Sequence, residues 1–216
     1  MRNLIKLGEP EILKNNNQQW LQEYVSDKQS SYKKYKYRNA DIKTRLKEET
    51  GFKCIYCESK IGHNTPGDIE HKVPSSKDIN QHFNWLNLTI ACTECNRRKN
   101  DYYVIGSEFL DPYRDNVESL LEHHGPLAYW KSNNDRAEIS IRILKLNSLS
   151  RQELVERKIT KMEEFSNLIE RFLSQSNQML KKLLWMQVEE MTNNKSEYSA
   201  MLQAVIEKKG ITITST

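Results

Sequence analysis

Two Cys-x-x-Cys pairs constrain the fold of this chain more than any other feature of its sequence. Cys54 and Cys57 form the first pair, Cys92 and Cys95 form the second, and the sequence has four cysteines in all. Each pair can present two thiolates from one tight turn, so together they supply the closed tetrahedral shell of a structural zinc ion. A disulfide or redox pair is the alternative, although nothing else in the sequence indicates a thioredoxin-like unit. Because four sulfur ligands leave no position for water, we expect the zinc to stabilise a small module rather than to act in catalysis.

Composition limits the class of protein. The chain has 216 residues, enough for one ordinary domain with attached helices or for two small domains. Its 33 basic and 29 acidic residues leave a net charge of +4, which permits binding to nucleic acid without requiring it. Few glycines and prolines and a charged fraction of 29% favour a mostly helical chain. Because no apolar run has the length of a signal peptide or a membrane span, we expect a soluble cytoplasmic protein without membrane contact.

The first 50 residues have helical periodicity on both sides of a basic segment. Helices are predicted near residues 10–25 and 40–49, the second ended by Gly51. Residues 28–47 carry eight basic side chains and one acidic side chain, with tyrosines among them. Such a segment can bind a phosphate backbone while its aromatic rings stack on bases. A solvated loop is the other interpretation. The candidate contacts with nucleic acid here are Lys33, Lys34, Lys36 and Arg38.

The C-terminal part of the sequence predicts a series of helices. A capping box of Ser150 and Glu153 precedes a long amphipathic pattern, which continues at about 179–190 and again at 197–209. The alternation of apolar residues over 139–143 predicts a short strand, and an extended connector would look alike. The apolar stripe of the tail can pack on the N-terminal helices or on another subunit.

A carboxylate and a histidine lie side by side between the cysteine pairs. Phosphodiester hydrolysis requires a base for water and a cation that stabilises charge on phosphorus and on the leaving oxygen. Glu70 and Asn96 offer the oxygen ligands that Mg²⁺ or Mn²⁺ prefers, and His71 remains available as the base. Pro74 predicts that the strand ends soon after His71, and a second strand is expected at 88–91, followed by a helix from residue 93.

Further polar residues around this pattern have two interpretations each. Arg97, Arg98 and Lys99 follow at the expected helix and are candidates for phosphate contacts, or they form a solvated helix end. His82 is a candidate for phosphate binding or for assisting the leaving group, or it is a loop histidine with neither role. Asp68 shares the face of Glu70 on a regular strand and is a candidate for support of the metal ligands. His63, His123 and His124 are expected at the surface.

The ordered motifs resemble the HNH endonuclease family with its ββα-metal fold. The resemblance covers residues 51 to about 101 and rests on Ile-Glu-His-x-x-Pro at 69–74, Asn-Leu at 87–88 and Cys-x-x-Cys-Asn-x-x-Lys at 92–99. It implies that Asn87 braces the hairpin that aims His71. The expected fold class is α+β and mostly helical, with an HNH core at 51–112 between an N-terminal helical segment (1–50), a connecting segment (113–149) and a C-terminal helical region (150–216).

Three flanking segments are similar to a narrower group, the HNH nuclease subunit of Septu and some retron anti-phage defence systems. They read CIYCESKI, FLDPYRDN and ISIRILKLNSLSRQELVERK. The resemblance implies an ABC/SMC-like ATPase as partner, and a retron reverse transcriptase with its nucleic acid as a further one. Because this chain has no Gly-x-x-x-x-Gly-Lys loop, the ATPase would be another chain.

Three functional hypotheses follow from the sequence. The leading one is a nuclease that cuts DNA with a divalent metal. The second keeps the same site but makes RNA, including a structured RNA such as tRNA, the substrate. The third is a zinc-containing nucleic-acid-binding or assembly module without catalysis, in which Glu70, His71 and Asn96 would be dispensable.

Overall fold

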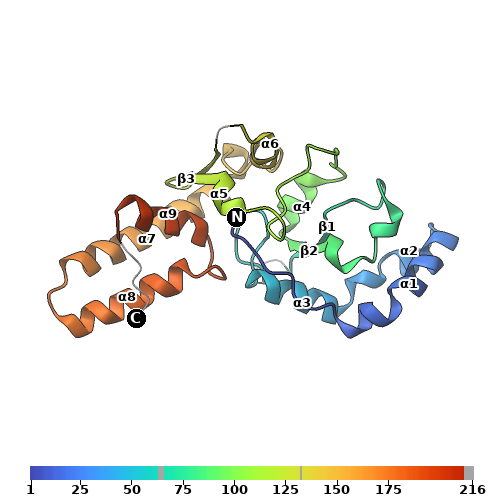
Figure 1. Cartoon of the computed structure of the whole chain (residues 1–216), viewed down its shortest axis with the longest axis horizontal. Helices are drawn as coiled ribbons and strands as arrows, with labels where there is room; N and C mark the ends of the chain where they lie inside the picture. Colours follow the sequence, from blue (N-terminus) through green and yellow to red (C-terminus); the bar gives the residue numbers. More distant parts are fainter. Residues whose placement is uncertain (63–65, 132, 212–216) are drawn as a thin grey trace.

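The computed structural model describes residues 1–62, 66–131 and 133–211. The N-terminal helices, a small strand-and-helix unit and a long C-terminal helical hairpin follow one another along the long axis (Figure 1). The strands form two-stranded antiparallel sheets, and helices make up most of the ordered elements, which confirms the expected mostly helical α+β class. No helix in the described parts of the chain combines the length and the apolar character needed to cross a bilayer.

The N-terminal segment forms three helices and one 3₁₀ turn: α1 (Glu11–Ser26), α2 (Ser31–Lys34), η1 (Lys36–Arg38) and α3 (Ala40–Thr50). These bounds confirm the helices expected near 10–25 and 40–49, whereas the basic stretch folds into short helices instead of an open loop. The Asn39 side chain caps α3 by accepting from Asp41 N at 2.8 Å. Gly51 ends α3 with φ of 63°, and a Cβ there would lie 2.5 Å from Lys195 Cβ, so only glycine fits.

The central unit is a hairpin followed by a helix. Strand β1 (Asp68–His71) pairs with β2 (Leu88–Ala91) so that Glu70 lies opposite Thr89, and α4 (Thr93–Lys99) packs on β1. The connection between the strands contains η2 (Ile79–Gln81) and η3 (Trp85–Asn87). All residues of β2 are buried. The strand ends before Pro74, the second strand spans 88–91 and the helix begins at Thr93, so the predicted ββα order is confirmed.

The connecting segment contains more regular structure than the sequence predicts. It comprises α5 (Val117–Leu120), a hairpin of β3 (Leu121–His124) and β4 (Leu127–Trp130), and α6 (Asp135–Ile143). The strand expected over 139–143 is wrong, because Asn134 caps a helix there by accepting from Ala137 N at 2.8 Å. Ser140 lies inside, where its hydroxyl accepts from Leu110 N at 2.9 Å and donates to Arg136 O at 2.7 Å. The strand prediction placed the polar residues between the isoleucines at the surface, and the buried Ser140 does not follow that pattern.

The C-terminal helices are η4 (Leu149–Arg151), α7 (Gln152–Ser174), α8 (Gln178–Thr192) and α9 (Ser199–Lys208). The later bounds confirm the helices predicted near 179–190 and 197–209. The predicted capping box is not formed, because the Ser148 hydroxyl caps η4 by accepting from Ser150 N at 3.2 Å and α7 begins only after that turn. Helices α7 and α8 pack on each other, and α9 packs on both and on β3 (Figure 1). The tail is therefore packed largely on itself rather than on the N-terminal helices.

Candidate active site and metal centre

The four cysteines come together where the turn that carries Cys54 and Cys57 lies beside the start of α4. Their Sγ atoms all lie within 4.8 Å of one another. A zinc ion about 2.3 Å from each sulfur of a regular tetrahedron requires sulfurs about 3.8 Å apart, and the Sγ atoms of Cys57 and Cys92 are separated by 3.8 Å. Cys92 also serves as the N-cap of α4 and accepts from Cys95 N at 3.4 Å. The donor set and its spacing fit a structural zinc ion.

A cavity of about 1050 Å³ opens beside the hairpin. Its lining includes Glu70 and His71 from β1 and Asn96 from α4, so the fold brings three of the four predicted active-site residues together. The rest of the lining comes mainly from the N-terminal helices and the β1–β2 connection, with Lys34 and Arg38 among these residues. Oxygen donors, an imidazole and basic side chains therefore share one cavity.

His71 is held in a defined tautomer by a backbone carbonyl. Its Nε2 atom lies 2.8 Å from the carbonyl oxygen of His82. A carbonyl only accepts, so Nε2 carries the proton and Nδ1 keeps its lone pair. Burial lowers the pKa of His71 to about 3, and the neighbouring His82 ring adds to this shift. The imidazole is therefore neutral near pH 7 and can accept a proton at Nδ1.

Glu70 forms a buried ion pair. Its Oε1 atom lies 2.5 Å from Lys99 Nζ, and that ammonium also donates to the carbonyl of His71 at 2.8 Å. Burial raises the pKa of Glu70 to about 7 even though Lys99 opposes the shift. Lys99 was expected to contact phosphates, but its side chain is only 3% exposed and is used inside the protein. That expectation fails because the turn of α4 carrying Lys99 faces β1.

Asn96 and Asp68 complete the group of oxygen donors. Asn96 Nδ2 donates to Asp68 Oδ2 at 3.3 Å, and Asp68 also lines the cavity. This contact fixes the amide and leaves its oxygen outside the hydrogen bond. Asp68 and Glu70 alternate along β1 and share one face. Carboxylate and amide oxygens are the donors that a hard divalent cation prefers, so Glu70 and Asn96 fit Mg²⁺ or Mn²⁺, with Asp68 holding the Asn96 amide.

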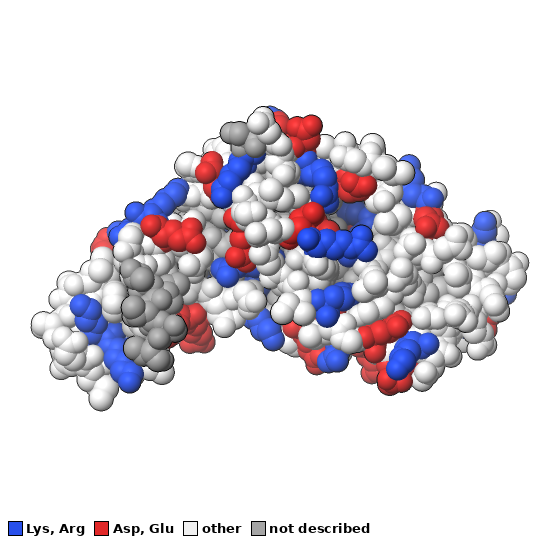
Figure 2. Space-filling view, in the orientation of Figure 1, with Lys and Arg blue, Asp and Glu red and all other residues white. Residues whose placement is uncertain are grey.

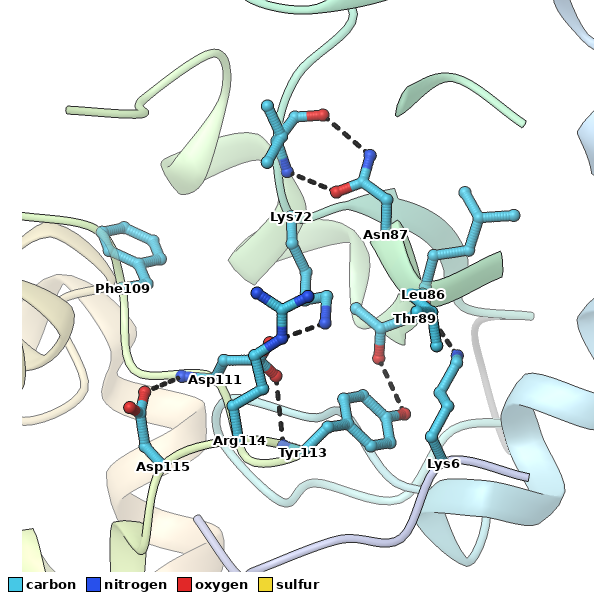
Figure 3. Close-up of polar contacts among 12 residues, drawn as sticks. Lys6, Lys72, Leu86, Asn87, Thr89, Phe109, Asp111, Tyr113, Arg114 and Asp115 are labelled. Carbon is cyan, nitrogen blue, oxygen red and sulfur yellow. Dashed lines mark hydrogen bonds and ion pairs between the residues drawn. The ribbon is translucent and has the colours of Figure 1, made fainter. Parts of the chain in front are cut away.

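Asn87 lies outside the cavity and holds the β1–β2 connection. Its Oδ1 atom accepts from Val73 N at 2.7 Å, and Nδ2 donates to the carbonyl of Val73 at 3.0 Å (Figure 3). The same Nδ2 also donates to the carbonyl of Gln81 at 2.9 Å. These bonds tie the chain after His71 to the start of β2. The geometry fits a brace for the hairpin rather than a group that touches substrate.

The back of the hairpin is closed by the segment after Phe109. Lys72 Nζ pairs with Asp111 Oδ2 at 2.6 Å, and the Tyr113 hydroxyl lies 3.2 Å from Thr89 Oγ1 (Figure 3). The same hydroxyl donates to Glu49 of α3 at 2.8 Å. Residues 111–113 therefore fasten β2 to the N-terminal helices.

The predicted phosphate-binding residues separate into two groups. Arg97 and Arg98 pair with Glu94 at 2.9 and 2.6 Å, Lys33 pairs with Asp27 at 3.2 Å, and Lys36 pairs with Glu23. None of these four lines the cavity, whose basic lining residues are Lys28, Lys34, Arg38, Lys43 and Lys77. The sequence did not single out Lys43 or Lys77, because only the fold brings them to this wall. Lys and Arg side chains are interspersed with Asp and Glu over the face in Figure 2, in keeping with the small net charge.

Two histidines are more buried than the sequence suggests, although His82 does line the cavity. His82 is 1% exposed, and its ring bonds Lys34 O at 2.7 Å through Nε2 and the Ser75 hydroxyl through Nδ1. With both nitrogens used, it does not offer a phosphate contact, which corrects that expectation. His123 was expected at the surface but is buried on β3, whereas His124 is exposed as predicted. His63 lies outside the described residues.

Comparison with known proteins agrees with this geometry. The family model of the HNH endonuclease matches residues 54–102. The chain is 28% identical to the Septu protein PtuB of Bacillus thuringiensis over 112 residues, which are 51% of this chain and 42% of that protein. It is 29% identical to the Septu protein PtuB of Bacillus mycoides (strain KBAB4) over 152 residues, 56% of this chain and 50% of that protein. The chain thus spans at most about half the length of these curated relatives. Residues 54–102 are an HNH endonuclease domain.

Proposed function

We propose that this chain is an endonuclease that hydrolyses phosphodiester bonds with the help of Mg²⁺ or Mn²⁺, with DNA as the favoured substrate. One observation carries the proposal: a neutral His71 with an unprotonated Nδ1 lines the same cavity as Glu70 and Asn96. A base and a cation site within one cavity are what phosphodiester hydrolysis requires.

In this mechanism the side chains of the chain divide the work. His71 Nδ1 removes a proton from the attacking water, and the carbonyl of His82 holds the imidazole in the tautomer that can do so. Glu70 and Asn96 would hold the divalent cation, with Asp68 fixing the amide of Asn96. The bound cation supplies charge stabilisation on the phosphate and on the leaving oxygen. Asn87 acts at a distance, by holding the connection that follows His71.

The substrate is expected to lie along the part of the cavity that the N-terminal helices line. Lys34 and Arg38 belong to that part, and Arg38 lies 4.1 Å from the centre of the Tyr35 ring. Basic groups of this kind bind phosphates, which DNA and RNA share. The family resemblance favours DNA, and RNA remains the second candidate, which a direct cleavage assay separates from it.

The similarity to two Septu PtuB proteins supports a role as the nuclease of an anti-phage defence system. We therefore propose that a separate ABC/SMC-like ATPase is the partner, and because both relatives are Septu proteins the proposal leaves out a retron reverse transcriptase. Exposed apolar side chains on α8 support the C-terminal region (150–216) as the docking part, with 51–112 as the catalytic core; they are Met179, Leu180, Leu183 and Met186.

The decisive experiment compares wild-type protein with His71→Ala on supercoiled plasmid DNA and on tRNA, each with and without Mg²⁺. We expect wild type to cut one substrate in a metal-dependent way and His71→Ala to lose about 10²- to 10⁴-fold in rate at unchanged binding. His124→Ala, an exposed histidine on β3, is the matched control and should cut normally. Equal cutting by His71→Ala would refute the mechanism. Binding without cutting by wild type, alone or with a co-purified partner, would favour the assembly module without catalysis.

A further inference from the structure

The metal centre reaches beyond the HNH domain to an arginine at the start of the C-terminal helices. Arg151 Nη1 donates to Cys95 Sγ at 3.3 Å and to the carbonyl of Leu144 at 3.0 Å. Arg151 as a whole is only 8% exposed. Arg151 lies far outside the matched segment 54–102 and follows Cys95 by 56 positions in the sequence.

A second buried cation lies two helical turns further along α7. Lys158 is 4% exposed and donates to the carbonyl of Pro126 at 3.2 Å. Lys158 lies within α7, whereas Arg151 ends η4 and is the N-cap residue of α7. Burial lowers the pKa of Lys158, and the neighbouring Cys57 and Glu58 oppose that shift. Of these two buried basic residues, Arg151 is the one that contacts the cysteine cluster directly.

A positive charge beside the cysteine cluster would compensate the negative charge of the zinc site. Four thiolates and one Zn²⁺ ion carry a net charge of about −2, and a buried charge is costly unless it is paired and hydrogen bonded. The Ser59 hydroxyl, 3.2 Å from Cys57 Sγ, supplies a dipole but no charge. Arg151 supplies a positive charge and a direct N–H···S hydrogen bond.

We propose that Arg151 is a positioning and charge-compensating residue of the zinc site, so that retention of zinc depends on the docking of α7. Hydrogen bonds to metal ligands tune metal affinity, and their loss typically costs 10- to 100-fold. Linkage makes the dependence mutual: zinc binding also stabilises the docked position of the C-terminal helices. The inference rests on the proposed zinc site and is independent of the proposed nuclease activity.

The test measures zinc retention of the full chain. Zinc-loaded wild type, Arg151→Met, Arg151→Lys and Arg157→Met are treated with a chromogenic zinc chelator, and the dissociation constant is obtained by competition. We expect Arg151→Met to bind zinc about 10- to 100-fold more weakly and Arg151→Lys to lie between it and wild type. Arg157→Met, a change at an exposed arginine of α7, should retain wild-type affinity. Wild-type zinc affinity in a folded Arg151→Met protein would overturn the proposal.

A spectroscopic measurement covers the case in which Arg151→Met fails to fold. Co²⁺ replaces zinc in wild type and in Arg151→Lys, which keeps the charge but not the guanidinium geometry. Loss of the hydrogen bond to Cys95 should shift the thiolate-to-cobalt charge-transfer bands relative to wild type and to Arg157→Met. Identical spectra together with identical zinc affinity in Arg151→Lys would remove Arg151 from the metal site.

Discussion

The imidazole rings of His71 and His82 are stacked, with centroids 4.7 Å apart and planes inclined by 7°, while the backbone carbonyl of His82 binds His71 Nε2 at 2.8 Å. His82 therefore holds the proposed base, His71, by two contacts: its ring stacks on the imidazole, and its carbonyl accepts a hydrogen bond from it. Its own ring is anchored by Lys34 O and the Ser75 hydroxyl. A histidine outside the HNH motif thus determines where His71 points.

Replacing His82 by Ala removes the stacked ring and both anchors but keeps the carbonyl. We expect the catalytic rate constant for DNA cleavage to fall about 10- to 100-fold, as for the loss of other orienting groups, while KM changes little. Steady-state kinetics checks this, with His124→Ala as the control. A variant that loses affinity but not rate would place His82 in substrate binding instead.

Removing Glu70 should cost stability as well as activity. Glu70→Ala leaves the buried Lys99 ammonium without its carboxylate, which typically destabilises a protein by about 3–5 kcal/mol. Urea unfolding of the zinc-loaded protein measures the difference. The double variant Glu70→Ala with Lys99→Met removes both charges and should recover most of the lost free energy. No recovery in the double variant would show that the ion pair is not the cause.

Cys92→Ser should lower zinc content and thermal stability together, because Cys92 is both a proposed zinc ligand and the cap of α4. Zinc analysis and thermal unfolding of the same preparations check the coupling. Treatment of wild type with a strong chelator should reproduce the loss of stability, and full zinc content in Cys92→Ser would contradict the four-thiolate site.

His123 makes stability depend on pH. Burial lowers its pKa from 6.5 to about 3. Between these values the unfolded chain binds the proton and the folded chain does not, so the contribution is complete above pH 6.5 and is lost as pH falls toward 3. Between pH 7 and pH 5 the protonation of this residue should lower the free energy of unfolding by about 2 kcal/mol. His123→Phe should flatten that part of the stability profile measured by urea unfolding, and an unchanged profile would exclude the role.

Each basic side chain of the cavity should make its own contribution to nucleic-acid binding. Lys34→Gln and Arg38→Gln each remove one cavity-lining charge and should weaken nucleic-acid binding and reduce its salt dependence by about one unit of slope. Arg97→Gln, whose guanidinium pairs with Glu94 away from the cavity, is the control. Binding isotherms at several salt concentrations compare them, and equal effects of all three changes would contradict this assignment of the binding wall.

The sequence predicts the metal module well because its signals are local. Cys-x-x-Cys turns, a proline after a strand and the order of the motifs each act within a few residues, so the strands at 68–71 and 88–91 and the helix from Thr93 are in place. The α3 helix is likewise delimited by Asn39 and Gly51 at its ends.

Tertiary contacts explain what the sequence did not reveal. Ser140 looks like an outward residue of a strand until Leu110 N provides its buried partner. Lys99 looks like a solvated helix end until β1 places Glu70 beside it. Arg151 carries no signal of its own, since its sulfur partner lies 56 positions away. In each case the decisive partner is distant in the chain.

Lys34 both lines the cavity and anchors the His82 ring through its backbone carbonyl. A phosphate bound to Lys34 would contact the same residue whose carbonyl holds His82, and the carbonyl of His82 in turn holds the proposed base, His71. Substrate binding and the position of the proposed base would therefore be coupled through Lys34. A substrate that does not contact the N-terminal helices would not stabilise this arrangement of His82 and His71.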